Sequence, residues 1–366
     1  MSDQKIPDHK IILLLLTAAL LSSCAKNVKH LVKAGIVPME SIITLPSIGT
    51  SNHSLSIVYT GCGGMMIAAG KEALLTDPFY TGQWIGRLAT GIKIKPKNTS
   101  KVFEQLNTVV TASTDIKAVL VAHSHYDHLQ DLPYLLTQNL LPPDVQLVGS
   151  PSASCTIKKF MVKETFTNAN DYAYTQNDSG AAWIRISDHI RVMPIIAAHA
   201  PHTGKRSFMK GSNCENGFRF LKRAESRTSA FRWKVGPVYS FLIDILTDDQ
   251  ANTAVRIFLQ SSACEAPVGF PPTNDGKTID LALLGVALFD NVNGYPHALL
   301  NQLQAKQVIF IHWEDFFRDL YHKKPKSVRF TNINAFIAGL KRYYHTEDPK
   351  KYFLLPRPLT RLIIGY

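Results

Sequence analysis

The chain has 366 residues, of which 45% are hydrophobic and 19% are charged, and its formal net charge at pH 7 is +12. This apolar content allows a sizeable core, and the length allows one large domain or two small ones. Glycine and proline are at ordinary levels, and no repeat or biased tract is present. The sequence therefore excludes a repeat or low-complexity protein.

Residues 1–24 have the pattern of an export signal. A lysine-containing start precedes the apolar run 11–20, which is too short to span a bilayer as a helix of about 20 residues. The following sequence 21–24, LSSC, resembles a bacterial lipobox. That resemblance implies cleavage before Cys24 and acylation of this cysteine, and Ala25 behind it favours the outer membrane, facing the periplasm. An ordinary secretory signal with a chance cysteine is the alternative.

Cleavage leaves the net charge unchanged, because residues 1–23 contain two lysines and two aspartates (12 − 2 + 2). A basic surface favours anionic lipid head groups, phosphorylated substrates or polyanionic sugars, although it also serves solubility alone. Nucleic acid is not an expected partner behind an export signal. Residues 25–51 are predicted to be a tether with a short basic helix at 26–33.

One domain is expected from residue 52 to residue 366, and it opens with β-structure. The sequence predicts a strand at 56–60, a glycine-rich turn at 61–64 and a returning strand at 65–69. A third strand ends in the pair Asp77-Pro78.

The apolar run 116–122 predicts a buried strand of the parallel-sheet kind, and the sequence HSHYDH follows it. Side chains alternate along an extended segment, so His123 and His125 point the same way and can bind one ion. Asp127 and His128 face a second point as the chain turns into a helix. Imidazole and carboxylate together suit zinc and similar metals, and ligands bind at the carboxyl ends of strands in open α/β sheets.

Two later apolar strands also end in a histidine. The run 190–198 leads to His199, with His202 close behind, and the run 307–311 leads to His312. A histidine after a strand is usually structural. The motif at 123–128 makes a ligand role the preferred interpretation for His199.

The H-x-H-x-D-H motif resembles that of the metallo-β-lactamase fold hydrolases. The resemblance runs from residue 54 to the C-terminus and favours the branch with N-acylphosphatidylethanolamine phospholipase D and ascorbate-phosphate lactonase over the true β-lactamases. It implies an α/β fold, an αββα four-layer sandwich with metals at one edge. It also implies a hydrolase that uses a metal-bound hydroxide, with one or two zinc ions, or manganese or iron, as cofactor.

The same resemblance implies roles for individual residues. Six ligands divide into a first site of His123, His125 and His199 and a second site of Asp127, His128 and His312. Asp127 also orients water and accepts a proton. Asp77 lies beneath the ligands and fixes their loop by hydrogen bonds, or else caps the next segment. His202 is the substitute for His199 or a substrate contact, and His297 is a substrate contact or a helix start.

The sequence departs from the family at one position. After a predicted hairpin of strands 238–245 and 255–260, the family places an aspartate that bridges both metals, and this chain has Ser261. Cys264 and Glu265 are the nearest substitutes. Whether a second metal binds is therefore left open, and a non-catalytic metal-binding envelope protein is the alternative to a hydrolase.

Other features leave the substrate open. A phosphodiester or lipid-derived molecule is the first expectation, and a lactone or amide is the second.

The aromatic segment 79–100 borders the site or packs in the core. The basic insertion 203–234 covers the site or is a solvated loop. No disulfide is predicted, and Cys62, between two glycines, is interpreted as a tight packing position. The oligomeric state is not indicated.

Overall fold

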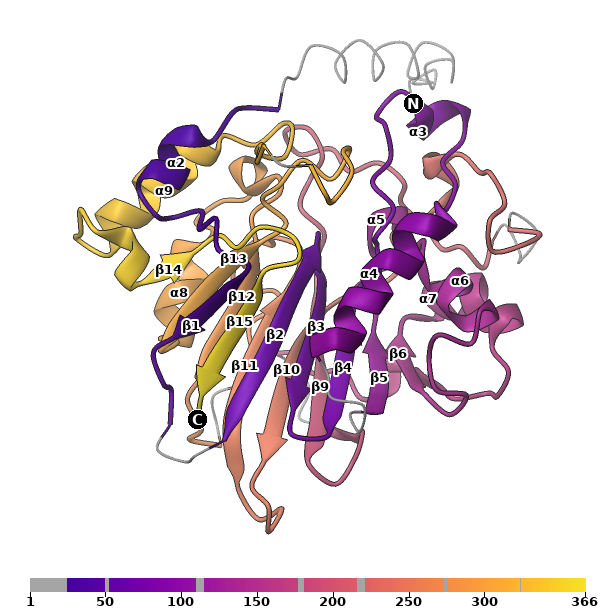
Figure 1. Cartoon of the computed structure of the whole chain (residues 1–366), viewed down its shortest axis with the longest axis horizontal. Helices are drawn as coiled ribbons and strands as arrows, with labels where there is room; N and C mark the ends of the chain where they lie inside the picture. The colour runs from indigo at the N-terminus through magenta and orange to yellow at the C-terminus, as the bar shows by residue number, and fades with distance from the viewer. Residues whose placement is uncertain are drawn as a thin grey trace, which may run out of the picture.

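The computed structural model describes residues 25–49, 53–109, 115–176, 181–215, 221–272, 275–322 and 324–366. The export signal predicted at 1–24 lies outside the described residues. Two β-sheets form the centre of the domain, and helices flank them (Figure 1). The predicted α/β architecture is confirmed.

The first sheet has eight strands and mixes parallel and antiparallel pairs. Its order is β1 (Ile42–Leu45), β15 (Arg361–Gly365), β2 (Ser54–Gly61), β3 (Gly64–Ala69), β4 (Glu72–Thr76), β5 (Asp115–Leu120), β6 (Gln146–Gly149) and β7 (Phe166–Asn168).

The second sheet has seven strands. Its order is β14 (Phe353–Leu354), β13 (Gln307–Ile311), β12 (Leu281–Gly285), β11 (Thr253–Gln260), β10 (Val238–Leu246), β9 (Ile190–Ala197) and β8 (Ile184–Arg185). The predicted hairpin is present, because β10 and β11 pair in antiparallel fashion.

The helices lie on the outer sides of the two sheets, with α4 in front of the first sheet in Figure 1. They are α2 (Lys29–Lys33), α3 (Arg87–Thr90), α4 (Pro96–Val109), α5 (Tyr126–Leu129), α6 (Leu132–Thr137), α7 (Pro151–Ile157), α8 (His297–Leu303) and α9 (Ile333–Tyr343). Helix α7 begins as predicted, since Ser150 accepts a hydrogen bond from the Ala153 amide at 3.1 Å.

Alternation along the strands explains why the core has three apolar layers. In β5, Leu120 faces the layer between the sheets, whereas Val119 faces the layer beneath α4. In β13, Ile309 faces the layer between the sheets and Phe310 faces α9. Strands buried on both faces need apolar residues at every position, which is why these segments are continuous apolar runs. The result is the αββα order of layers.

Two of the strands that carry candidate ligands, β5 and β13, run in parallel with their neighbours. β9 is antiparallel to β10, which is antiparallel to β11, so β9 and β11 run in the same direction. β4, β5 and β6 are parallel in the first sheet, and β11, β12 and β13 are parallel in the second. Their carboxyl ends therefore meet at one edge of the domain. This is the edge near α5, at the upper side of Figure 1.

The segment predicted as a tether packs against the domain. Val28 and Leu31 are buried in the layer beneath α8 and α9, and β1 pairs in parallel with β15. The structure differs from the prediction because the segment carries apolar residues that a solvated tether does not need. Its helix, α2, lies within the predicted range 26–33.

A disulfide joins Cys155 of α7 to Cys214, with the two Cα atoms 5.2 Å apart. This disulfide was not predicted, because the two cysteines are separated by 59 positions and lie in no recognisable spacing. The bond fastens the segment 203–234 to α7.

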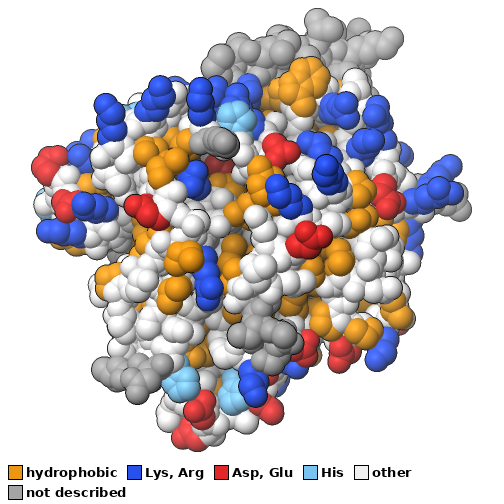
Figure 2. Space-filling view, in the orientation of Figure 1, with side chains coloured by type: hydrophobic (Ala, Val, Ile, Leu, Met, Phe, Trp, Pro, Cys, Tyr) orange, Lys and Arg blue, Asp and Glu red, His pale blue; other side chains and the backbone are white. Residues whose placement is uncertain are grey.

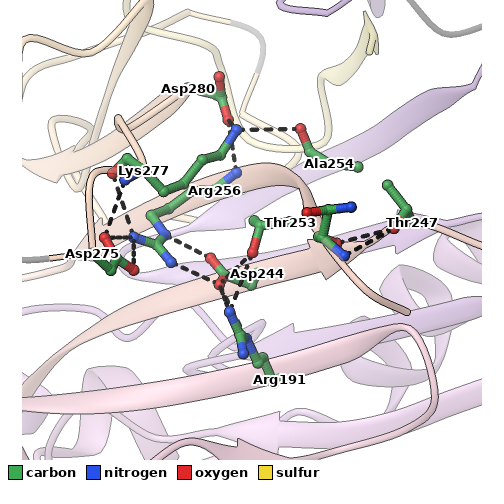
Figure 3. A network of polar contacts seen from close by, with 10 residues as sticks. Arg191, Asp244, Thr247, Thr253, Ala254, Arg256, Asp275, Lys277 and Asp280 are labelled. Atoms are coloured by element: carbon green, nitrogen blue, oxygen red, sulfur yellow. Dashed lines mark hydrogen bonds and ion pairs between the residues drawn. The ribbon is translucent and has the colours of Figure 1, made fainter. Parts of the chain in front are cut away.

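A buried ion network, drawn in Figure 3, lies in the second sheet. It is at the end of the strands opposite to the carboxyl ends of β9 and β11. The Asp244 carboxylate accepts hydrogen bonds from Arg256 Nε at 2.7 Å and from Arg191 Nη2 at 2.8 Å. Arg256 is 1% exposed and also contacts Asp275. The Trp183 ring packs over both guanidinium groups. These contacts fix the register of β9, β10 and β11.

Replacing Asp244 by alanine leaves Arg256 buried with part of its charge unpaired. We expect Asp244→Ala to lower the free energy of unfolding by about 3–5 kcal/mol, as measured by urea denaturation. The control is Asp188→Ala, which removes an exposed ion pair with Arg185 and should cost less than about 1 kcal/mol. Equal unfolding curves for the two variants would contradict a stabilising role of the network.

Candidate metal centre

The HSHYDH sequence forms the connection from β5 to α5. His125 is extended, with φ −65° and ψ 157°, and occupies the N-cap position of α5, which carries Asp127 and His128 in its single turn. His123, His125, Asp127 and His128 are all buried. The turn thus brings four potential ligands to the carboxyl end of one strand, as the sequence predicts.

Three histidines meet at the first cluster. The donor atoms of His123, His125 and His199 lie within 4.8 Å of one another. His199 comes from the end of β9 and donates from Nδ1 to the Ala200 carbonyl at 2.6 Å, which leaves Nε2 free for a metal. Both ring nitrogens of His123 and Nε2 of His125 are buried without a hydrogen-bond partner among the described residues. Unpaired buried polar atoms cost about 1–3 kcal/mol each, so the cluster fits a bound metal ion.

The electrostatics of these histidines suit the same role. Burial, together with repulsion between neighbouring imidazoles, holds the pKa of His123 and His125 well below the usual range. Burial and His202 lower the pKa of His199 to about 3. All three rings are therefore neutral at pH 7 and offer a lone pair to a metal without first losing a proton.

The second cluster forms around the Asp127 carboxylate. Asp127 Oδ2 lies 3.6 Å from His312 Nε2 and 3.8 Å from His128 Nε2. Burial alone would raise the pKa of Asp127, but His128 and His312 hold it well below the usual range. The structure thus brings together the three residues expected here. It also places Cys62 beside Asp127 and His312, with the donor atoms of these three within 4.8 Å of one another.

Asp77 lies directly beneath the ligands and is fully buried. Its Oδ1 accepts a hydrogen bond from the Ala122 amide at 2.7 Å, and its Oδ2 contacts His128 Nδ1 at 2.9 Å. Burial lowers the pKa of His128, but Asp77 and Asp127 outweigh it and raise the pKa. Asp77 therefore fixes the ligand loop and leaves His128 Nε2 directed towards Asp127, which is the geometry expected of it.

The sequence did not reveal the role of Glu314. Its Oε1 accepts a hydrogen bond from the Cys62 amide at 2.7 Å, and its other oxygen accepts one from the Tyr59 hydroxyl. The Tyr59 hydroxyl in turn accepts a hydrogen bond from the His312 amide at 2.8 Å. These contacts tie the turn after β2 to the ligand after β13. A buried glutamate two residues after a candidate ligand was the available signal.

Ser261 stands at the end of β11, where the family resemblance implies a bridging aspartate. It is 1% exposed, lines the pocket, and its hydroxyl has no hydrogen-bond partner among the described residues. The two substitutes are turned elsewhere, because Cys264 donates to the Val268 carbonyl and Glu265 accepts from Asn293. Asp127 is the one carboxylate among the described residues that line this pocket.

The pocket above the ligands is largely apolar. Its walls include Leu88, Phe208, Phe231, Leu288, Phe316 and Phe317. Phe208 and Phe231 belong to the segment 203–234, which therefore covers the site, and Leu88 belongs to the segment 79–100. Phe79 and Tyr80, at the start of the segment 79–100, are instead buried in the hydrophobic core.

The two remaining candidate histidines have different positions. His202 lines the pocket, and its ring stacks against that of His199 with the centroids 4.9 Å apart. His297 lies outside the pocket. It begins α8 and packs against Tyr343 of α9, with the ring centroids 5.5 Å apart. A helix start is the interpretation that its position supports.

No protein-family model matches this sequence, and no curated protein sequence matches it. Among solved structures, it is similar to Igni18, a metallo hydrolase of Ignicoccus hospitalis (10% identity, TM-score 0.46, 86% of this chain and 99% of that one). It is also similar to YhfI, a metallo-β-lactamase fold protein of Bacillus subtilis (10% identity, TM-score 0.43, 85% of this chain and 98% of that one). A third similar structure is that of CmlA, a diiron β-hydroxylase of Streptomyces venezuelae (11% identity, TM-score 0.44, 87% of this chain and 55% of that one). At such identities the likeness does not extend to substrate or metal.

The low pKa values at the first cluster predict a pH dependence for the metal-free protein. Below about pH 6.5, the unfolded chain binds protons at His123, His125 and His199, whereas the folded chain does not. Stability is therefore fully present above this pH and is lost as pH falls towards the folded values, by about 1.4 kcal/mol per pH unit for each histidine. His128, with its raised pKa, acts in a different range: its stabilisation is fully present below about pH 6.5 and is lost as pH rises through the folded value.

Urea denaturation of chelator-treated protein at a series of pH values measures this slope. We expect His199→Ala to reduce the slope by about one histidine's share, roughly 1.4 kcal/mol per pH unit. A free energy of unfolding that stays constant from about pH 7 to about pH 5 would show that these imidazoles are not held neutral by the fold.

Proposed function

We propose that this protein is a metal-dependent hydrolase of the cell envelope that acts on a phosphodiester or lipid-derived substrate. The observation that carries the proposal is the convergence of His123, His125 and His199 beside the Asp127 carboxylate at the base of an apolar pocket. A metal in such a site acts as a Lewis acid and brings the pKa of water towards about 7.

The residues of the chain supply the rest of the chemistry. The three neutral imidazoles would hold the ion. Asp127, ionised because its pKa is lowered by His128 and His312, accepts a hydrogen bond from the attacking water and orients it. Asp77 and Glu314 keep the ligand loops in place from beneath. His202, neutral because burial lowers its pKa, lies within the pocket and is placed to contact substrate. No serine or cysteine nucleophile is required.

The pocket favours a substrate with an apolar part. Aromatic and aliphatic side chains form most of its wall, and such walls bind apolar groups while a few polar residues fix orientation. An acyl chain beside a phosphoryl or carbonyl centre fits this distribution. A lactone or amide with an acyl chain is the second candidate, because it presents the same apolar part to the same wall.

A membrane location is consistent with the charge distribution. Figure 2 shows Lys and Arg side chains along the upper edge of the molecule, where α2 and α3 lie in Figure 1. Trp84, just before α3, is 65% exposed. A basic edge with an exposed aromatic side chain suits an anionic lipid surface. None of the helices in the described part of the chain is long and apolar enough to cross a membrane. We propose acylated Cys24 as the anchor.

Hydrolysis by the zinc-loaded full chain tests the proposed activity. We expect turnover of a chromogenic phosphodiester or of an acyl ester or lactone, and a loss of at least about 100-fold in kcat/KM for His123→Ala, because the first cluster loses a ligand. The control is His30→Ala, an exposed histidine of α2, which should keep full activity. Metal binding without turnover of any of these substrates would favour the non-catalytic alternative.

The apolar wall predicts chain-length preference within the same assay. We expect Phe231→Ala to raise KM for a long-chain substrate by about tenfold and to leave a short-chain substrate unchanged, because only the long chain reaches this ring. The matched control is Val162→Ala, which shortens a 73% exposed apolar side chain away from the pocket. Equal effects on long and short chains would argue against an acyl-binding wall.

The anchor is tested by fractionating cells that express the full chain. We expect the protein in the detergent-extracted membrane fraction and Cys24→Ser in the soluble envelope fraction, because one cysteine carries the acyl groups. Cys264→Ser changes a buried cysteine of the domain and should leave the distribution unchanged. A Cys24→Ser protein that stays in the membrane fraction would contradict the lipid anchor.

A further inference from the structure

Cys62 occupies a position that is unusual for a residue with a side chain. It lies in the turn between β2 and β3, with glycine on both sides, and its φ is +52°. Backbone in this left-handed region favours glycine, and a cysteine there costs about 1 kcal/mol or more. The turn also lies close to the ligands, since a Cβ added to Gly63 would lie 2.2 Å from Asp77 Oδ2 and 2.6 Å from the Ser261 Cβ.

Hydrogen bonds fix the Cys62 backbone against the ligand loops. Its amide donates to Glu314 Oε1 at 2.7 Å, and Glu314 follows His312 by two residues. The Tyr59 hydroxyl bonds both Glu314 and the His312 amide. The thiol is therefore not carried by a mobile loop. It is held in a fixed relation to His312.

The thiol lies beside two of the three residues of the second cluster. Its sulfur is within 4.8 Å of donor atoms of Asp127 and His312, and the residue is fully buried. On the other side, Ser261 offers only a hydroxyl where a bridging carboxylate is expected. Thiolate, carboxylate and imidazole are all ligands that zinc accepts.

We propose that the Cys62 thiolate is a ligand of a second metal ion, together with Asp127 and His312, in a site where Ser261 offers no carboxylate. On binding, the S–H bond breaks, a metal–sulfur bond forms and the proton passes to solvent. A thiolate selects zinc or another borderline-soft ion over magnesium or calcium. The inference rests on the proposed metal centre but assigns a ligand that the sequence motif does not contain.

X-ray absorption spectroscopy of the zinc-loaded full chain tests the assignment without altering Cys62. The protein used is Cys24→Ser/Cys264→Ser, in which Cys62 is the one free thiol, because Cys155 and Cys214 form the disulfide. We expect a zinc–sulfur distance of about 2.3 Å, beside zinc–nitrogen distances of about 2.0 Å from the histidines.

Cobalt substitution gives an independent readout. The cobalt-loaded protein should show a thiolate-to-cobalt charge-transfer band that Cys62→Ser and Cys62→Ala both lack, while Cys264→Ser keeps it. Near-ultraviolet circular dichroism establishes that each variant is folded. If neither Cys62 variant folds, the X-ray absorption measurement, which leaves Cys62 unaltered, still shows whether sulfur binds zinc.

The outcomes separate this inference from the proposed function. Zinc bound by nitrogen and oxygen alone, with hydrolysis intact, would overturn the role of Cys62 and leave the hydrolase standing. Failure to retain zinc or cobalt at all would overturn both. A sulfur ligand that disappears only in the Cys62 variants supports the assignment, whether or not the tested substrates are hydrolysed.

Discussion

The burial of His123 without a hydrogen-bond partner in the described chain is the constraint on which the centre depends. Both of its ring nitrogens are enclosed, its pKa is held low by burial and by neighbouring imidazoles, and His125 and His199 lie against it. An apolar side chain of similar size would pack there at lower cost. A bound cation accounts for the arrangement because it supplies the interaction that each imidazole lacks.

Strained backbone surrounds this centre. Cys62, Asp77 and His312 all have positive φ, and each directs a side chain towards the ligands or their supports. Strain of this kind costs roughly 1–3 kcal/mol per residue and persists only where the surroundings enforce it. Here the enforcing contacts are those of Asp77 with Ala122 and of Glu314 with Cys62. The two sheets, joined by the apolar layer between them, provide the rigid frame for those contacts.

Strand periodicity made much of the fold predictable. The continuous apolar runs before His123 and His312 indicate strands buried on both faces, and β5 and β13 are such strands. That these histidines lie close together could be predicted as well, because the carboxyl ends of parallel strands meet at one edge of a sheet. The packing of the segment 25–49 was not predicted, since local composition does not show which surface an apolar residue will meet.

Side-chain relations between distant turns were also beyond the sequence. Cys62 appeared to be a packing residue because its neighbours are glycines, and only the folded turn brings its sulfur to Asp127. The contact of Glu314 with Cys62 joins residues 252 positions apart. The Cys155–Cys214 bond was hidden for the same reason, as no local pattern relates α7 to the segment that covers the site.

The metal content per chain decides whether the buried histidines form a metal centre. It is measured by elemental analysis of the full chain after loading with zinc, before and after dialysis against a chelator, with His123→Ala as the comparison. We expect the wild type to retain zinc through dialysis against buffer, chelator to remove it, and His123→Ala to retain less. A chain that binds no zinc, manganese or iron under any of these conditions would contradict the assignment of a metal centre.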